Sequence, residues 1–235
     1  MKQVADNVYF LPLSPFINAY LLVGSNDLTL IDTGIEGNHK AVAKHLQEKG
    51  YALGDIARVL ITHAHPDHVG SLPEILAASG AEVWAHELDA PVIRGEQSLA
   101  SIQPQPESLP PFARLVSKAG SPDQPTAPVA RELHEGEVLD EVYPGLSVVH
   151  LPGHSPGQVG FWSQEQGFLI GGDVLMHLPW RLTLPFRAFT TDWQEAQRSA
   201  KKVAALQVQT LCLGHGEPYV GNAAAQVDKV IGRLA

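Results

Sequence analysis

The stretch Ile61–His68 reads Ile-Thr-His-Ala-His-Pro-Asp-His and places three histidines and one carboxylate within six residues. A strand-like run over residues 57–62 leads into it. Side chains two residues apart in an extended backbone point to the same side. His63 and His65 can therefore converge on one cation, so the stretch predicts a metal site at the end of a strand.

The second half of this stretch changes the direction of the chain. Pro66 cannot continue a regular strand and predicts a turn, after which residues 69–79 are helix-like. Asp67 and His68 would lie at the start of that helix and face a different point, where a second metal could bind. Imidazole and carboxylate suit zinc, and also iron or manganese. Four such residues at this spacing favour a metal site over a polar turn with incidental histidines.

The residues before this stretch predict an opening β-meander. Residues 8–11, 18–23 and 28–31 have strand signals, and Asp32-Thr33-Gly34 follows the third run. A carboxylate at a strand end is well placed for a site, although Asp also caps turns. Residues 39–49 are helix-like and amphipathic.

After the first metal stretch, Gly80 is expected to close the helix and residues 81–85 to form a strand. His86 follows and is expected to be structural. Residues 90–130 are then rich in proline, with one helix-like piece over residues 112–118. Long irregular insertions are often functional, so this segment is either a substrate lid or a solvent-exposed spacer.

Three more polar residues follow strand-like runs in the second half of the chain. His154 stands between two Pro/Gly turns after strand signals over residues 138–149. Asp173 ends a hairpin expected over residues 159–162 and 168–170, and His215 follows a run over residues 208–213. Two helices are expected over residues 192–206 and 223–234. The apolar, irregular residues 175–189 should form the wall of a substrate pocket, with Met176, Trp180, Arg181 and Phe186 as candidate lining residues.

The composition is that of an ordinary globular protein. The 235 residues are 44% hydrophobic and 17% charged, which fits a single domain over residues 1–235. There is no apolar run of the roughly 20 residues that a membrane span needs, and no signal-like N-terminus, so we expect a cytoplasmic protein. A net charge of −9 argues against nucleic-acid binding and favours a small-molecule substrate. Cys212 is the single cysteine, which excludes an intrachain disulfide, and it is expected to be buried.

Taken together, the four polar motifs resemble the metallo-β-lactamase superfamily. They are Asp32-Thr33-Gly34, the histidine stretch 63–68, Gly153–Gly157, and the pair formed by Gly172-Asp173 and Gly214-His215-Gly216. The resemblance covers nearly the whole chain. It implies an α/β fold, a four-layer αβ/βα sandwich with two β-sheets face to face, helices outside and a metal site at one edge.

The resemblance also implies a ligand set. One ion would be held by His63, His65 and His154, and a second ion by Asp67, His68 and His215. Asp173 would bridge the two ions, and Asp32 would orient a ligand histidine from behind. The implied cofactors are two divalent ions, with zinc expected and iron or manganese as alternatives.

The implied activity is hydrolysis of a small carboxylic ester, thioester or lactone by metal-bound hydroxide, with Asp67 also handling a proton. Within the superfamily, the ligand set is similar to that of glyoxalase II and of the lactonases. Two alternatives remain open. The first is a mononuclear iron sulfur (persulfide) dioxygenase, and the second is a non-catalytic metal-binding module.

Overall fold

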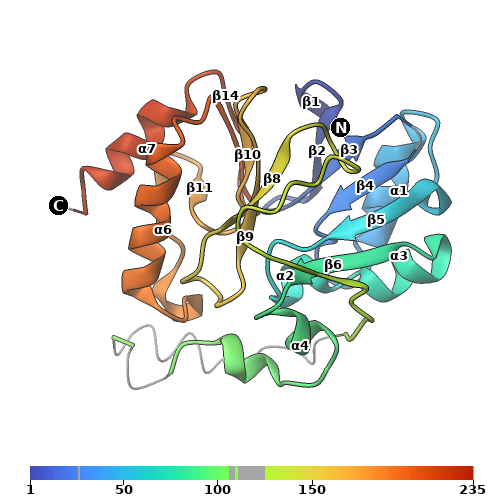
Figure 1. Ribbon diagram of the computed structural model, residues 1–235, viewed down its shortest axis with the longest axis horizontal. Helices are drawn as coiled ribbons and strands as arrows, with labels where there is room; N and C mark the ends of the chain where they lie inside the picture. The colour runs from blue at the N-terminus through green and yellow to red at the C-terminus, as the bar shows by residue number, and fades with distance from the viewer. Residues whose placement is uncertain (26, 106–108, 111–124, 235) are drawn as a thin grey trace.

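Two β-sheets lie face to face, and helices cover the outer face of each sheet (Figure 1). The structure is a computed structural model that describes residues 1–25, 27–105, 109–110 and 125–234. In Figure 1, α1 and α3 lie outside the sheet that carries β4–β6, and α6 and α7 lie outside the sheet that carries β8–β10. The order of layers is therefore helix, sheet, sheet, helix, which confirms the four-layer sandwich.

The larger sheet has the order β1-β2-β3-β4-β5-β6-β7. The pairs from β1 to β4 are antiparallel, and those from β4 to β7 are parallel. Its strands are β1 (Lys2–Ala5), β2 (Val8–Ser14), β3 (Ile17–Val23), β4 (Leu28–Ile31), β5 (Ile56–Leu60), β6 (Glu82–His86) and β7 (Arg131–Leu133). The parallel pairs place the carboxyl ends of β4, β5 and β6 along one edge.

The second sheet has the order β14-β13-β10-β9-β8, and a separate two-stranded sheet pairs β11 with β12. Within the five-stranded sheet, β10 and β13 are parallel, so their carboxyl ends also share one edge. The strands are β8 (Leu146–His150), β9 (Val159–Ser163), β10 (Phe168–Ile170), β11 (Met176–Leu178), β12 (Arg181–Thr183), β13 (Thr210–Cys212) and β14 (Tyr219–Val220).

The helices connect these strands. The α-helices are α1 (His39–Gln47), α2 (Pro66–Val69), α3 (Leu72–Ser79), α4 (Ala90–Ile93), α6 (Trp193–Ala205) and α7 (Ala223–Ile231). Short 3-10 turns are η1 (Leu53–Asp55), η2 (Leu99–Ile102) and η4 (Arg187–Phe189). Asp192 begins α6 by accepting hydrogen bonds from the backbone N–H groups of Gln194 and Glu195. None of the helices in the described ranges is long and apolar enough to cross a membrane.

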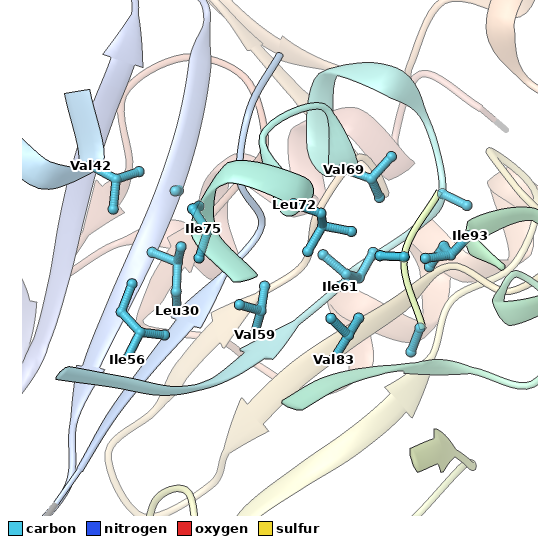
Figure 2. Close-up of a cluster of buried hydrophobic side chains, with 14 of the residues drawn as sticks. Leu30, Val42, Ile56, Val59, Ile61, Val69, Leu72, Ile75, Val83 and Ile93 are labelled. Carbon is cyan, nitrogen blue, oxygen red and sulfur yellow. The ribbon is translucent and has the colours of Figure 1, made fainter. Parts of the chain in front are cut away.

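Three separate apolar clusters hold the four layers together. The first lies between the larger sheet and its helices, where Leu30 and Val59 meet Val42 and Ile75 (Figure 2). The second lies between the sheets and includes Tyr20 and Phe161, and the third joins the second sheet to α6 and α7. Strands covered on both faces have no polar face. This explains why the five central residues of β3 are all buried.

Most expected elements are confirmed within a few residues. The short elements β7, α4 and β14 were not predicted, and four further differences follow. Residues 2–5 form β1, a half-exposed strand that is too short to show a clear alternation of apolar and polar residues. Residues 138–149 hold only the strand β8, with an isolated bridge at Val138. Residues 175–189, expected to be irregular, contain the hairpin β11–β12. The helix expected over residues 69–79 is interrupted at Gly70 and Ser71, and Pro73 lies in the first turn of α3, where its missing N–H costs no helical hydrogen bond.

The proline-rich segment over residues 90–130 belongs in part to the core. Val92, Ile93, Ile102 and Ala127 are buried in the first apolar cluster, so these parts of the segment are not a solvent-exposed spacer. The helix-like piece expected over residues 112–118 lies outside the described residues, and the prediction of a lid over residues 90–130 stays a prediction. We interpret residues 1–235 as one domain, because the middle cluster draws side chains from both sheets.

Candidate metal centre

The polar residues singled out in the sequence lie at the strand ends of both sheets. Asp32 directly follows β4, and the histidine stretch follows β5. His154 lies in the loop after β8, Asp173 follows β10, and His215 follows β13. Because β4 and β5 are parallel, as are β10 and β13, each sheet presents its loops on one edge. The seven predicted ligands meet where these two edges face each other.

Three buried histidines converge on one point. Nε2 of His63 lies 3.1 Å from Nδ1 of His65, and that Nδ1 lies 2.9 Å from Nε2 of His154. The ring planes of His63 and His65 make an angle of 80°, and those of His65 and His154 make an angle of 84°. Burial lowers the pKa of His63 well below its ordinary value and that of His154 to about 3. The rings are therefore neutral and have lone pairs to offer a cation.

A second group joins Asp67, His68 and His215. Oδ2 of Asp67 lies 3.3 Å from Nε2 of His215 and 3.9 Å from Nε2 of His68. Burial alone would lower the pKa of His68, but Asp32 and Asp173 outweigh it and raise the pKa to about 9. Burial likewise opposes a charge on His215, yet Asp173 and Asp67 raise its pKa to about 11. Without a cation, the protonated rings of His68 and His215 balance the negative charge of these carboxylates.

Asp173 lies between the two groups. Its Oδ2 is 2.9 Å from Nε2 of His215 and 3.5 Å from Nε2 of His154, one histidine from each group. Its Oδ1 is 3.5 Å from Nε2 of His68. Within the described residues, that Oδ1 and that Nε2 are buried without a hydrogen-bond partner. Buried polar atoms are rarely left unpaired, so this pair fits a site made for a cation.

Asp32 fixes the orientation of His68 from behind. Its Oδ2 accepts a hydrogen bond from Nδ1 of His68 at 2.8 Å, and its carboxylate also accepts from the backbone N–H and the hydroxyl of Thr62. Nδ1 of His215 similarly donates to the backbone oxygen of Phe16 at 2.5 Å. In both rings Nδ1 is occupied, which directs Nε2 toward Asp67 and Asp173.

Comparison with protein families decides to which family this chain belongs. The family model described as the metallo-beta-lactamase superfamily matches residues 15–215, which include all seven predicted ligands. The chain belongs to this superfamily. It is a metal-dependent hydrolase, and the curated relatives that it matches along most of its length include proteins named probable metallo-hydrolase and hydroxyacylglutathione hydrolase.

Two relatives and two solved structures illustrate this similarity. The probable metallo-hydrolase YflN of Bacillus subtilis is 26% identical over 99% of this chain and 89% of its own length. The hydroxyacylglutathione hydrolase GloC of Haemophilus influenzae is 26% identical over 72% of each chain. The metallo-beta-lactamase family protein TTHA1429 of Thermus thermophilus superposes with a TM-score of 0.73 at 26% identity, covering 99% of this chain and 80% of that one. TTHA1623, solved in a di-iron-bound form, superposes with a TM-score of 0.64 at 29% identity, covering 89% and 91%.

A cavity of about 570 Å³ opens beside the metal-ligand candidates of this superfamily member. His65, Asp67, His154, Asp173 and His215 form its polar side. The rest of the wall is mainly apolar and comes from Phe16, Ile35, Met176, Leu178, Phe186 and Phe189. Gln103 and His177 add polar atoms to it. A substrate in this cavity would touch apolar side chains and the candidate ligands at once.

Two of the four predicted pocket residues line this cavity and two do not. Met176 and Phe186 belong to the wall, whereas Trp180 and Arg181 lie outside it. The reason is the hairpin that the sequence did not predict. Trp180 lies in its turn and is 80% exposed, and Arg181 begins β12 and is also exposed.

Asp89 is a buried residue of this site that the sequence did not reveal. Its carboxylate accepts hydrogen bonds from the backbone N–H of Ala64, the hydroxyl of Ser155 and the backbone N–H of Gly157. Burial raises its pKa, and these three hydrogen bonds oppose the rise. The available signal was an Asp shortly after a strand and directly before the Ala-Pro that opens α4, which reads as an ordinary helix start.

Proposed function

We propose that this chain is a dinuclear metallohydrolase that acts on a small carboxylic ester, thioester or lactone. The observation that carries the proposal is the position of Asp173, whose carboxylate lies within 3.5 Å of a histidine nitrogen in each of the two candidate ligand groups. A carboxylate has two oxygens and one negative charge, so it suits the space between two cations. The di-iron form of TTHA1623 supports a two-ion centre in this fold.

In this proposal each candidate residue has a defined role. His63, His65 and His154 hold one ion, while Asp67, His68 and His215 hold the other, with Asp173 shared and Asp32 orienting His68. The ions, when bound, supply a water of lowered pKa and a positive charge that stabilises a developing oxyanion. Asp67 reaches the cavity wall and its side chain is 34% exposed, so it can exchange a proton with the substrate side. Histidine and carboxylate ligands favour zinc, with iron or manganese as alternatives.

The cavity wall supports an uncharged, apolar substrate group. Apolar side chains surround the candidate ligands, and neither Arg181 nor Arg187 lines the cavity. Arg181 is exposed on the hairpin, and the guanidinium of Arg187 lies 5.1 Å from the ring centre of Trp193. The name of the relative GloC, a hydroxyacylglutathione hydrolase, supports thioesters as one substrate class.

The test is a substrate panel run on protein of measured metal content. Esters, thioesters and lactones with short and long acyl chains are compared, and we expect hydrolysis by a chain that holds two ions, with higher kcat/KM for apolar acyl groups. One iron per chain with oxygen consumption on a persulfide would support the dioxygenase alternative instead. Two ions per chain without turnover of any panel member would contradict the proposed substrate class.

A further inference from the structure

Asp89 connects two loops that come from different sheets. Its carboxylate accepts a hydrogen bond at 2.8 Å from the backbone N–H of Ala64, which lies between His63 and His65 in the loop after β5. Ser155, whose hydroxyl donates at 2.7 Å, directly follows His154 in the loop after β8. One carboxylate therefore holds a residue directly beside each of the three histidines of the first candidate group.

The contacts are made by a side chain that is almost fully buried. Asp89 is 1% exposed, and its two oxygens divide three donors between them. Oδ2 accepts from Ala64 and Ser155, and Oδ1 accepts from the N–H of Gly157 at 2.6 Å. Hydrogen bonds to a charged acceptor are shorter and stronger than neutral ones. Such a set fixes the separation of the two loops better than apolar packing does, because it depends on direction.

The ordinary explanation of Asp89 as a helix cap is not supported. Asp commonly caps a helix by accepting from the N–H groups of its first turn. Asp89 precedes α4, yet its side chain makes no such bond to that helix. The loop after β8 is instead pressed against it, since a side chain at position 157 would meet Asp89 atoms at 2.6 Å. The carboxylate is committed to the two histidine loops.

We propose that Asp89 is a positioning residue that sets the distance of His154 from His63 and His65, and so selectively supports metal binding by this group. The inference rests on the proposed two-ion centre. It also assigns the two buried carboxylates that are not candidate ligands, Asp89 and Asp32, to different halves of that centre. Asp89 acts through the backbone beside the three-histidine group, whereas Asp32 acts on His68 in the other group.

This division allows a crossed experiment with Asp89→Asn and Asp32→Asn. An amide has one acceptor oxygen and presents an NH2 group to at least one of the three donors. Asp89→Asn therefore breaks the hydrogen-bonded link between the two loops while the side chain keeps its size. Zn2+ affinity at each group is measured by chelator competition, and Co2+ absorption reports the geometry of each. We expect the three-histidine group of Asp89→Asn to lose about 10- to 100-fold in affinity, the range known for outer partners of metal ligands. Asp32→Asn should weaken the other group.

A second variant keeps the test decisive if Asp89→Asn does not fold. Ser155→Ala removes one of the three donors and should weaken the same group by a smaller factor. Unchanged Zn2+ affinity in both variants, or an equal loss at both groups, would overturn the positioning role. A wild-type chain that binds fewer than two ions would overturn the proposed centre itself, and the measurement on the wild type shows this before any variant is compared.

Discussion

At the scale of single residues, the site depends on carboxylates whose surroundings keep them ionised. Burial raises the pKa of Asp173, but the opposite effect of His215 and His68 is larger, and the pKa falls to about 2. Asp67 is likewise kept ionised, because His68 and His215 outweigh the effect of burial on its pKa. Both side chains therefore present negative charge to the space between the histidines over the whole physiological range of pH.

Asp173→Asn is the most informative change at this scale. The amide keeps the shape but removes the charge, and a neutral group bridges two cations poorly. We expect the variant to lose mainly one ion while His63, His65 and His154 remain partly occupied, and hydrolysis to fall about 10- to 100-fold or more. Metal content and turnover are measured on the same purified sample. Two ions per chain with near-normal turnover would refute the bridging role.

At the scale of elements, the two sheets also touch through a pair of histidines outside the candidate metal centre. His86 ends β6 and His150 ends β8, and their rings stack at 4.2 Å with 12° between their planes. His86 is buried and its Nδ1 accepts from the N–H of Leu88. Burial, followed by repulsion from His150, lowers the pKa of His86 to about 4, although Glu87 opposes this and His134 and Glu135 have smaller effects. The ring packs in its neutral form, as expected for a structural histidine.

This packing predicts a pH dependence of stability. An unfolded histidine has a pKa near 6.5, so the unfolded chain binds a proton here more readily than the folded chain. The contribution of His86 is complete above about pH 6.5 and is lost as the pH falls toward 4. We expect the melting temperature to fall more steeply from pH 7 to 5 in wild type than in His86→Phe, both measured with chelator present. Parallel curves would show that His86 has the same pKa in the folded and the unfolded chain.

At the scale of the whole molecule, the candidate metal centre joins the two halves of the sandwich. His63, His65, Asp67 and His68 follow a strand of the larger sheet, and His154, Asp173 and His215 follow strands of the other. Nε2 of His68 and Oδ1 of Asp173, which lack partners within the described residues, come from opposite sheets. A cation bound there would connect the two sheets at this edge.

Metal removal should therefore lower stability and activity together. A ligand that binds only the folded chain raises the free energy of unfolding by mass action, and seven polar side chains without a cation remain poorly compensated. We expect chelation to lower the melting temperature and abolish hydrolysis, and Zn2+ to restore both. Full activity in chain shown by elemental analysis to be metal-free would refute the metal-dependent reaction.

The sequence by itself determined the parts of this protein that depend on local pattern. Alternation and turn residues located most strands, and the polar residues after them were found because strand ends repeatedly carried His or Asp. The spacing of His63 and His65 predicted that they converge, since an extended backbone fixes which side each points to. The resemblance of four separated motifs supplied the layer order, which periodicity does not contain.

Only the tertiary structure decided which residues are neighbours across the two sheets. Trp180 and Arg181 were expected in the pocket, but a hairpin turn directs them away from it. Asp89 resembled a helix start in the sequence, yet its carboxylate accepts from loops that lie 25 and 66 residues away along the chain. Such partners are invisible to sequence patterns, because the same short motif accepts hydrogen bonds from whichever donors the packed layers bring to it.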